Sequence, residues 1–304
     1  MNLAVDRAPA TVAPGVDETP LAFACGDQTL WGIVSAPAAG VARSGCAVLI
    51  VVGGPQYRVG SHRQFVQLAR ALAAAGHVAL RFDYRGMGDA NGEARDFQDL
   101  DLDILAALAA LRQCCPDVRR TLMWGLCDGA SAALMLLQRQ PQTLVDGLCL
   151  VNPWVRSTQT QAATQVKHYY AQRLLQGAFW RKLFAGGVSW RSLGELAGSA
   201  RSMLARRDTG TGGATLGFQQ RMALAWRHWR GPVLLLLSGD DFTAKEFMET
   251  VDKDPAWTGA WARAALERVD LPGADHTLSN PQHGDAAVSA TLDWLARLPT
   301  LARP

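Results

Sequence analysis

The sequence places one cysteine in a setting that suits a nucleophile. Cys127 is the central residue of Gly125-Leu126-Cys127-Asp128-Gly129, which follows an apolar run and precedes a stretch of small residues. In a strand-to-helix turn of this form the central residue adopts a strained backbone and projects above the sheet. A thiolate is a strong nucleophile, and the positive end of the following helix should stabilise it. The motif therefore predicts covalent chemistry at Cys127, and a small buried cysteine in a turn is the alternative.

An acid and a base follow Cys127 in the chain order that such a turn requires. The apolar run at 233–237 leads into Asp240 and Asp241, and His276 comes after the last expected strand. We expect His276 to take the thiol proton of Cys127 and to return it to the leaving group, while an aspartate orients the imidazole. Alternate residues of an extended segment face opposite ways, so Asp240 and Asp241 cannot both serve. We favour Asp241.

Backbone N–H groups are expected to stabilise the oxyanion of a tetrahedral intermediate. One donor should be Asp128, directly after the nucleophile, and the other should come from the loop Gly53-Gly54-Pro55-Gln56. Proline has no N–H, so the sequence favours Gly54, with Gln56 second. A tight turn without a catalytic role is the alternative for the two glycines.

The sequence indicates neither a metal site nor a cofactor. The other histidines lack metal-ligand spacing, the acids form no divalent-ion cluster, and no Gly-x-Gly-x-x-Gly run opens a helix. A net charge of +3 is too small to demand nucleic acid or a membrane surface as partner. Neither a signal peptide nor an apolar run of about 18 residues is visible, so no integral membrane segment and a cytoplasmic location are expected.

Hydrophobic periodicity predicts the elements that must position these residues. The Gly26-Asp27 turn predicts a hairpin of two strands over 21–37. Apolar runs predict six further strands, at 46–52, 77–83, 121–126, 144–152, 233–238 and 266–271. Helical periodicity appears at 65–76, 101–113, 130–140 and 285–298. Apolar strands alternating with helices predict an α/β fold whose mostly parallel eight-stranded sheet carries helices on both faces.

Two regions depart from this rhythm. Residues 1–20, with their acids and prolines, are expected to be a flexible tail before a domain over 21–304. Residues from about 154 to 230 have helical periodicity and predict an inserted cap. The stretch 152–230 holds 12 Lys and Arg against two acids. This charge favours an anionic substrate group such as a phosphate, a carboxylate or a coenzyme A moiety, and a solvated basic face is an equal alternative.

Taken together, these motifs resemble the α/β-hydrolase superfamily from about residue 21 to 298. Asp83-Tyr84-Arg85-Gly86-Met87-Gly88 is similar to its D-x-R-G-x-G loop, which braces structure. The run Gly53 to Arg58, the Cys127 motif and Ser238 to Ala244 resemble more narrowly the exosortase A system-associated hydrolases of type 1. Members of that family are encoded with exopolysaccharide synthesis and protein-sorting genes. The resemblance implies a hydrolase fold with a triad of Cys127, Asp241 and His276.

The predicted activity is hydrolysis of a small-molecule acyl ester or thioester through an acyl-enzyme on Cys127. Two alternatives remain open at the level of sequence. A sugar hydroxyl could accept the acyl group if the cap excludes water, which would make the protein an acyltransferase. A non-catalytic binding or scaffold protein of the polysaccharide machinery could instead use the basic cap on an anionic membrane surface or a partner. The sequence does not determine the oligomeric state.

Overall fold

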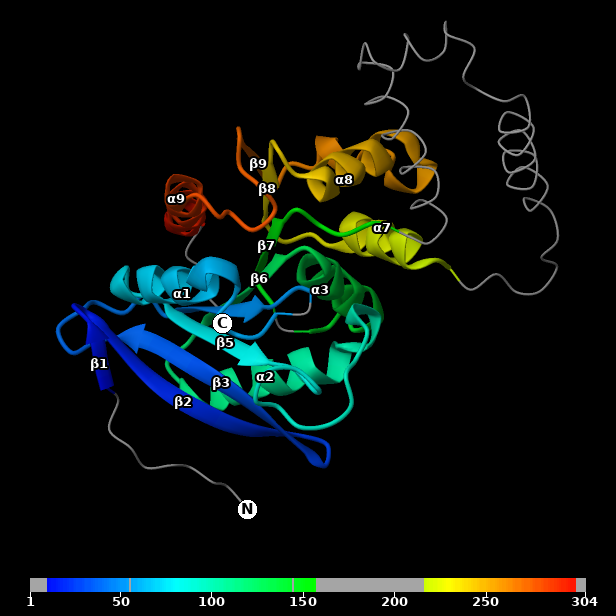
Figure 1. Ribbon diagram of the computed structural model, residues 1–304. Coiled ribbons are helices and arrows are strands. Elements are labelled where there is room, and N and C mark those ends of the chain that lie inside the picture. The colour runs from blue at the N-terminus through cyan, green and yellow to red at the C-terminus, as the bar shows by residue number, and fades with distance from the viewer. Residues whose placement is uncertain (1–9, 55, 144, 157–215, 299–304) are drawn as a thin grey trace, which may run out of the picture. The chain divides into compact units, whose positions relative to one another are not determined.

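The computed structural model describes residues 10–54, 56–143, 145–156 and 216–298. In this part of the chain nine strands form one sheet in the order β1-β2-β3-β5-β4-β6-β7-β8-β9 (Figure 1). The strands are β1 (Ala10–Ala13), β2 (Val16–Cys25), β3 (Gln28–Pro37), β4 (Cys46–Val51), β5 (Val78–Asp83), β6 (Arg120–Leu126), β7 (Gly147–Val151), β8 (Val233–Ser238) and β9 (Leu266–Leu271). Strands β4 to β9 are parallel, and β1 to β3 pair in antiparallel fashion. The eight predicted strands are present, and β1 is an addition.

Helices cover both faces of the sheet, which explains why β4, β5, β7 and β8 are buried along their whole length. The α-helices are α1 (Gln64–Ala74), α2 (Asp101–Cys114), α3 (Asp128–Arg139), α7 (Phe218–His228), α8 (Phe242–Lys253) and α9 (Pro281–Arg297). Short 3-10 helices lie at Ser61–Arg63, Phe97–Asp99, Pro255–Trp257 and Ala260–Ala262. Figure 1 shows α1 and α9 on one side of the sheet and α2 and α3 on the other. This arrangement confirms the predicted α/β-hydrolase fold.

The parallel strands end at one edge of the sheet, and the loops that leave this edge carry the residues predicted to be catalytic. Strand β4 lies between β5 and β6, so the strand order reverses there. In open α/β sheets, ligands bind outside the carboxyl ends of the strands at such a reversal. Cys127 directly follows β6, Asp241 lies three residues after β8, and His276 lies five residues after β9. The fold therefore gathers these loops from distant parts of the sequence.

The N-terminal boundary differs from the predicted flexible tail over 1–20, because residues 10–20 include β1 and the first half of β2. Residues 1–9 lie outside the described part. Glu18 in β2 accepts hydrogen bonds from Ser35 Oγ at 2.9 Å, Arg70 Nη2 at 2.8 Å and Arg81 Nη2 at 3.1 Å. These interactions lower the pKa of Glu18 although burial opposes them. The acid that suggested a solvated tail is thus paired across the sheet.

The predicted cap at about 154–230 lies mainly outside the described residues, which exclude 157–215. The last part of the predicted cap, α7, is described. It packs against α3 and is part of the main compact unit, whereas Arg156–Gly217 are assigned to a second unit. Trp226 of α7 is buried, lies near Phe247 and Trp257, and donates from Nε1 to the Ala260 carbonyl at 3.1 Å. The apolar face of α7, at the end of the predicted cap, therefore packs in the main core.

Candidate active site

Cys127 occupies a strained turn between β6 and α3. Its backbone angles are φ 59° and ψ −125°, a region that non-glycine residues rarely adopt. The backbone packs too closely at the two neighbouring glycines for any side chain to fit. A Cβ on Gly125 would lie 2.7 Å from the Ala130 nitrogen, and one on Gly129 would lie 2.5 Å from the Val51 oxygen. The flanking glycines of the motif therefore permit the turn that the sequence predicts.

Hydrogen bonds anchor the backbone of this turn to the neighbouring strand and helix. The Cys127 N–H donates to the Val151 carbonyl at 2.9 Å, at the end of β7. The Cys127 carbonyl accepts from the Ala130 N–H at 3.1 Å and from the Trp154 N–H at 3.2 Å. Because both backbone groups are engaged, the strained geometry is held in place and the partly exposed thiol is presented at the sheet edge.

The structure brings Asp241, rather than Asp240, into contact with His276. Asp241 Oδ2 lies 2.7 Å from His276 Nδ1, and Asp241 is 5% exposed. Asp241 is also the N-cap of α8, where its carboxylate accepts from the Thr243 N–H at 2.9 Å and from the Ala244 N–H at 3.4 Å. Asp240 is exposed. The helix start thus fixes the carboxylate that orients the imidazole.

Electrostatic interactions change the pKa of His276. The hydrogen bond that His276 donates to Asp241 raises the pKa of His276 above its ordinary value, although burial of the ring opposes this. The charges of Asp128 and Asp275 act in the same direction. With Nδ1 held by Asp241, Nε2 is the nitrogen that remains for proton transfer. The arrangement suits a base that gains a proton during acylation.

Two of the predicted oxyanion donors, Gly54 and Gln56, donate internal hydrogen bonds. The Gly54 N–H donates to the Asp128 carboxylate, and the Gln56 N–H donates to the Gly54 carbonyl at 2.8 Å. Tyr84 Oη donates to that carbonyl as well, at 3.0 Å. Burial raises the pKa of the Asp128 carboxyl, and hydrogen bonds from nearby amides such as that of Gly54 only partly offset this. An incoming oxyanion would therefore compete with the Asp128 side chain for Gly54.

Sequence reasoning missed one residue that positions this site. Asn152 directly follows β7, is fully buried and has a positive φ of 46°. Its side-chain amide donates to Ser238 Oγ at 2.9 Å, and its carbonyl oxygen accepts from the Ser238 N–H at 2.9 Å. These bonds tie the ends of β7 and β8 together just before the Asp241 loop. An asparagine directly after a buried strand is the available signal, because asparagine tolerates positive φ.

Asp275 holds the turn that contains His276. Its carboxylate accepts from the Thr277 N–H at 2.9 Å, from the Ser279 N–H at 3.0 Å and from Ser279 Oγ. These hydrogen bonds lower the pKa of Asp275 to about 2. The side chain therefore braces the loop and contributes no second acid to His276 Nδ1.

Replacing Asp275 by asparagine should lower the free energy of unfolding at pH 7 by about 1 kcal/mol, a value reduced for solvent screening. Because the folded-state pKa is depressed from 3.8 to about 2, this stabilisation is present above pH 4 and is lost as the pH falls towards 2. Urea unfolding at pH 7 and pH 3 should show the wild type and the variant converging at the lower pH. Asp27→Asn, in an exposed turn, is the control, and an equal gap at both pH values would contradict the role.

Neither a metal cluster nor a membrane span appears in the described part of the chain. No group of three or more His, Cys, Asp and Glu side chains among the residues described could hold a metal ion. None of the helices described combines the length and apolar character needed to cross a bilayer.

Comparison with known proteins gives a family match and many structural relatives. The sequence profile described as "Alpha/beta hydrolase family" matches residues 48–291. An esterase from Pyrococcus furiosus is 16% identical with a TM-score of 0.60, over 96% of this chain and 98% of that chain. A dienelactone hydrolase from Anabaena variabilis is 16% identical with a TM-score of 0.57, over 93% and 98%. An α/β serine hydrolase without a lid from Xanthomonas campestris is 15% identical with a TM-score of 0.54, over 93% and 97%. No curated protein sequence matches the chain.

Proposed function

Because the chain belongs to the alpha/beta hydrolase family, we propose that it cleaves a small-molecule acyl ester or thioester through an acyl-enzyme on Cys127. The observation that carries this proposal is the 2.7 Å contact between Asp241 and His276, on loops that leave the same edge of the sheet as the strained Cys127 turn. Nucleophile, base and orienting acid come from the ends of three different strands, and their roles match the chemistry of acyl transfer.

The proposed reaction has two stages. In the first, His276 Nε2 accepts the thiol proton while the Cys127 sulfur attacks the acyl carbonyl. The resulting tetrahedral intermediate expels the alcohol or thiol, which takes the proton from His276 and leaves an acyl-thioester on Cys127. In the second, water attacks that thioester with His276 as base, and the carboxylic acid and the free thiol are released. Asp241 stabilises the imidazolium in both stages.

The N–H groups of Gly54 and Asp128 are the proposed oxyanion donors. For the Gly54 N–H to bind the oxyanion, its hydrogen bond to the Asp128 carboxylate must break when substrate binds. Two backbone donors would then face the developing negative charge, which is usually the largest single contribution to catalysis of this type.

The substrate proposal draws on the sequence. The 12 Lys and Arg against two acids at 152–230 support a substrate with an anionic portion, such as a phosphate, a carboxylate or a coenzyme A moiety. The motifs around Gly54, Cys127 and Asp241 that resemble the exosortase A system-associated hydrolases support a role alongside exopolysaccharide synthesis.

The test is to incubate the protein with short and medium p-nitrophenyl esters and acyl thioesters and to measure the intact mass. An acyl adduct located by peptide mapping on Cys127, with turnover, is expected in the wild type. Cys127→Ala should form no adduct, and His276→Ala should form one much more slowly. Analysis of the products with and without an added alcohol separates release of the acid from transfer. No adduct with any acyl donor, or an adduct formed equally fast in His276→Ala, would exclude the proposal.

A further inference from the structure

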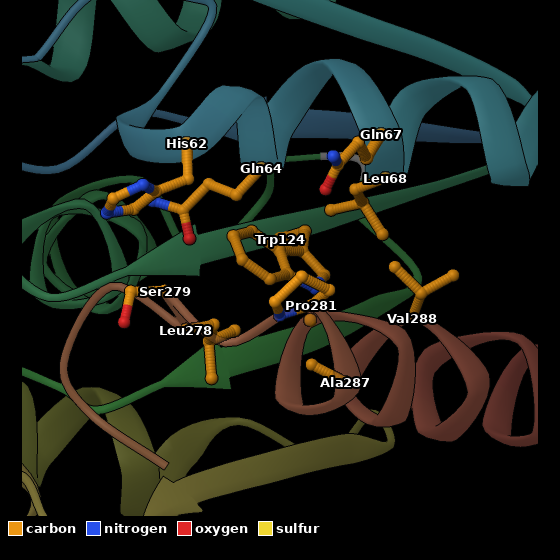
Figure 2. A pocket seen from close by; sticks show the side chains of 11 residues that line it. His62, Gln64, Gln67, Leu68, Trp124, Leu278, Ser279, Pro281, Ala287 and Val288 are labelled. Atoms are coloured by element: carbon orange, nitrogen blue, oxygen red, sulfur yellow. The ribbon is translucent and has the colours of Figure 1, made fainter.

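Residues of α1, β6, α9 and the loop before α9 line a small pocket, and Cys127 is not among them. Its volume is about 70 Å³. Figure 2 shows Gln64 and Gln67 on the α1 side, Leu278, Pro281 and Ala287 on the opposite side, and Trp124 of β6 between them. The inner wall is buried and largely apolar, whereas Gln67 and Pro281 are exposed at the rim. The pocket therefore opens to solvent and narrows to an apolar interior.

The side chain of Gln64 is the unusual feature of this pocket. Gln64 is 9% exposed, and neither Nε2 nor Oε1 of its carboxamide has a hydrogen-bond partner among the described residues. Buried amides are nearly always hydrogen-bonded, because an unpaired donor and acceptor are costly. A leucine of similar size would fit an apolar wall without that cost. The retained amide therefore points to a partner that enters the pocket.

The pocket shares a wall with the loop that carries His276. Leu278 and Ser279 line it, and both belong to the turn that Asp275 closes. Leu278 has a positive φ of 53°, an uncommon conformation for leucine, and its N–H donates to the Asp275 carbonyl at 3.2 Å. A group bound in the pocket would therefore touch the turn that holds the catalytic base, without touching Cys127.

We propose that this pocket binds a short neutral group that offers both a hydrogen-bond donor and an acceptor, such as a primary carboxamide or a hydroxyl on a stem of two or three carbons. The carboxamide of Gln64 matches a donor and acceptor pair. The lining contains no Lys, Arg, Asp or Glu, and its one ionisable side chain, His62, is exposed. A cavity of about 150 Å³ holds benzene, so about 70 Å³ suits a group of only a few heavy atoms. The proposal goes beyond the acyl chemistry at Cys127 and does not depend on it.

Titration with propionamide tests the proposal in the full-length protein. With ¹³C-labelled methyl groups, the signals of Leu68, Leu278 and Val288 should shift in a saturable way, with a Kd on the order of 1–10 mM. Gln64→Leu should weaken binding by about tenfold and should raise the melting temperature, because it removes the unpaired amide. Propionate should bind about tenfold more weakly than propionamide, because a carboxylate only accepts hydrogen bonds and must give up its hydration to enter.

A second position checks that the shifts report on this pocket. A Cβ on Gly284 would meet only the Leu278 oxygen, at 3.8 Å, so Gly284→Ala should fold and bind as the wild type does. Gly284→Leu should fill the pocket and abolish the saturable shifts. The proposal is wrong if the wild type shows no saturable shift, as expected for a pocket that holds only solvent, or if Gln64→Leu binds propionamide unchanged.

Competition identifies the source of the bound group. If it is part of the substrate, esters that carry a carboxamide or hydroxyl tail should displace propionamide from the wild type and from the inactive Cys127→Ala. If it is a separate small molecule, propionamide should bind unchanged in the presence of such esters and after alkylation of Cys127. Both outcomes support the pocket. Because binding is read from methyl shifts, the result stands even if no ester or thioester is turned over.

Discussion

Asp241→Asn should lower the turnover of an acyl substrate by about 10³–10⁴-fold, because the amide no longer orients the His276 tautomer or stabilises the imidazolium. Asparagine is an equally good N-cap, so the start of α8 should be preserved. The loss would then report on the contact between Asp241 Oδ2 and His276 Nδ1 and not on unfolding of the helix. Steady-state kinetics together with a urea unfolding curve measure the two effects separately.

The same variant should change the pH dependence of kcat/KM. His276 must be unprotonated to accept the thiol proton, so the rate falls as the pH drops below its pKa. Asp241 raises that pKa above the ordinary value of 6.5. The acidic limb of the wild-type profile should therefore lie above pH 6.5 and move to lower pH in Asp241→Asn, while the maximal rate is much smaller.

Asp240→Asn is the matched control for this experiment. Asp240 is exposed, its N–H donates to the Ala274 carbonyl at 2.9 Å, and the substitution leaves that backbone bond intact. Its turnover and acidic limb should stay within about twofold of the wild type. If Asp240→Asn instead lost activity and Asp241→Asn kept it, the assignment of the acid would have to be reversed.

Local patterns made the Cys127 turn and the strands predictable from the sequence. Glycines at 125 and 129 are needed within a few residues of Cys127, so the five-residue motif itself carries the geometry. Strands β4, β6 and β8 are continuous apolar runs because both of their faces are covered. The chain order of nucleophile, acid and histidine then indicated which loops should meet.

What the sequence could not supply depends on partners that lie far apart in the chain. Glu18 resembles a residue of a solvated tail until the fold brings Arg70 and Arg81 to it. The choice between Asp240 and Asp241 depends on where α8 begins, and we expected an extended segment there. We favoured Gly54 as an oxyanion donor because the proline in the same loop has no N–H. The Asp128 carboxylate that accepts its hydrogen bond is 74 residues away in the sequence. The contacts of Glu18 and Gly54 are tertiary, and no local pattern encodes them.

Asp83→Ala should lower the free energy of unfolding by about 3–5 kcal/mol, because it removes one partner of a buried ion pair. Asp83 ends β5, is 1% exposed and accepts from the Arg58 N–H at 2.6 Å, from the Asp89 N–H at 3.1 Å and from the Arg58 guanidinium. Its removal leaves two backbone donors unpaired and deprives Arg58 of its buried counter-charge. Asp83 belongs to the D-x-R-G-x-G loop, and these contacts hold that loop against the segment that contains Arg58.

The matched control is Asp89→Ala, which removes the other carboxylate that pairs with Arg58. The side chain of Asp89 is 66% exposed and lies 2.5 Å from Arg58 Nη2, so this pair is screened by solvent and should contribute less than about 1 kcal/mol. Urea unfolding of both variants, under identical conditions, gives the comparison.

Arg58 follows directly on the loop Gly53-Gly54-Pro55-Gln56-Tyr57, so Asp83→Ala should also slow acylation of Cys127 in the fraction that remains folded. Equal losses of stability in the two variants would show that the buried Asp83 contributes no more than a surface ion pair. Normal acylation in folded Asp83→Ala would show that Asp83 does not position the loop that contains Gly54.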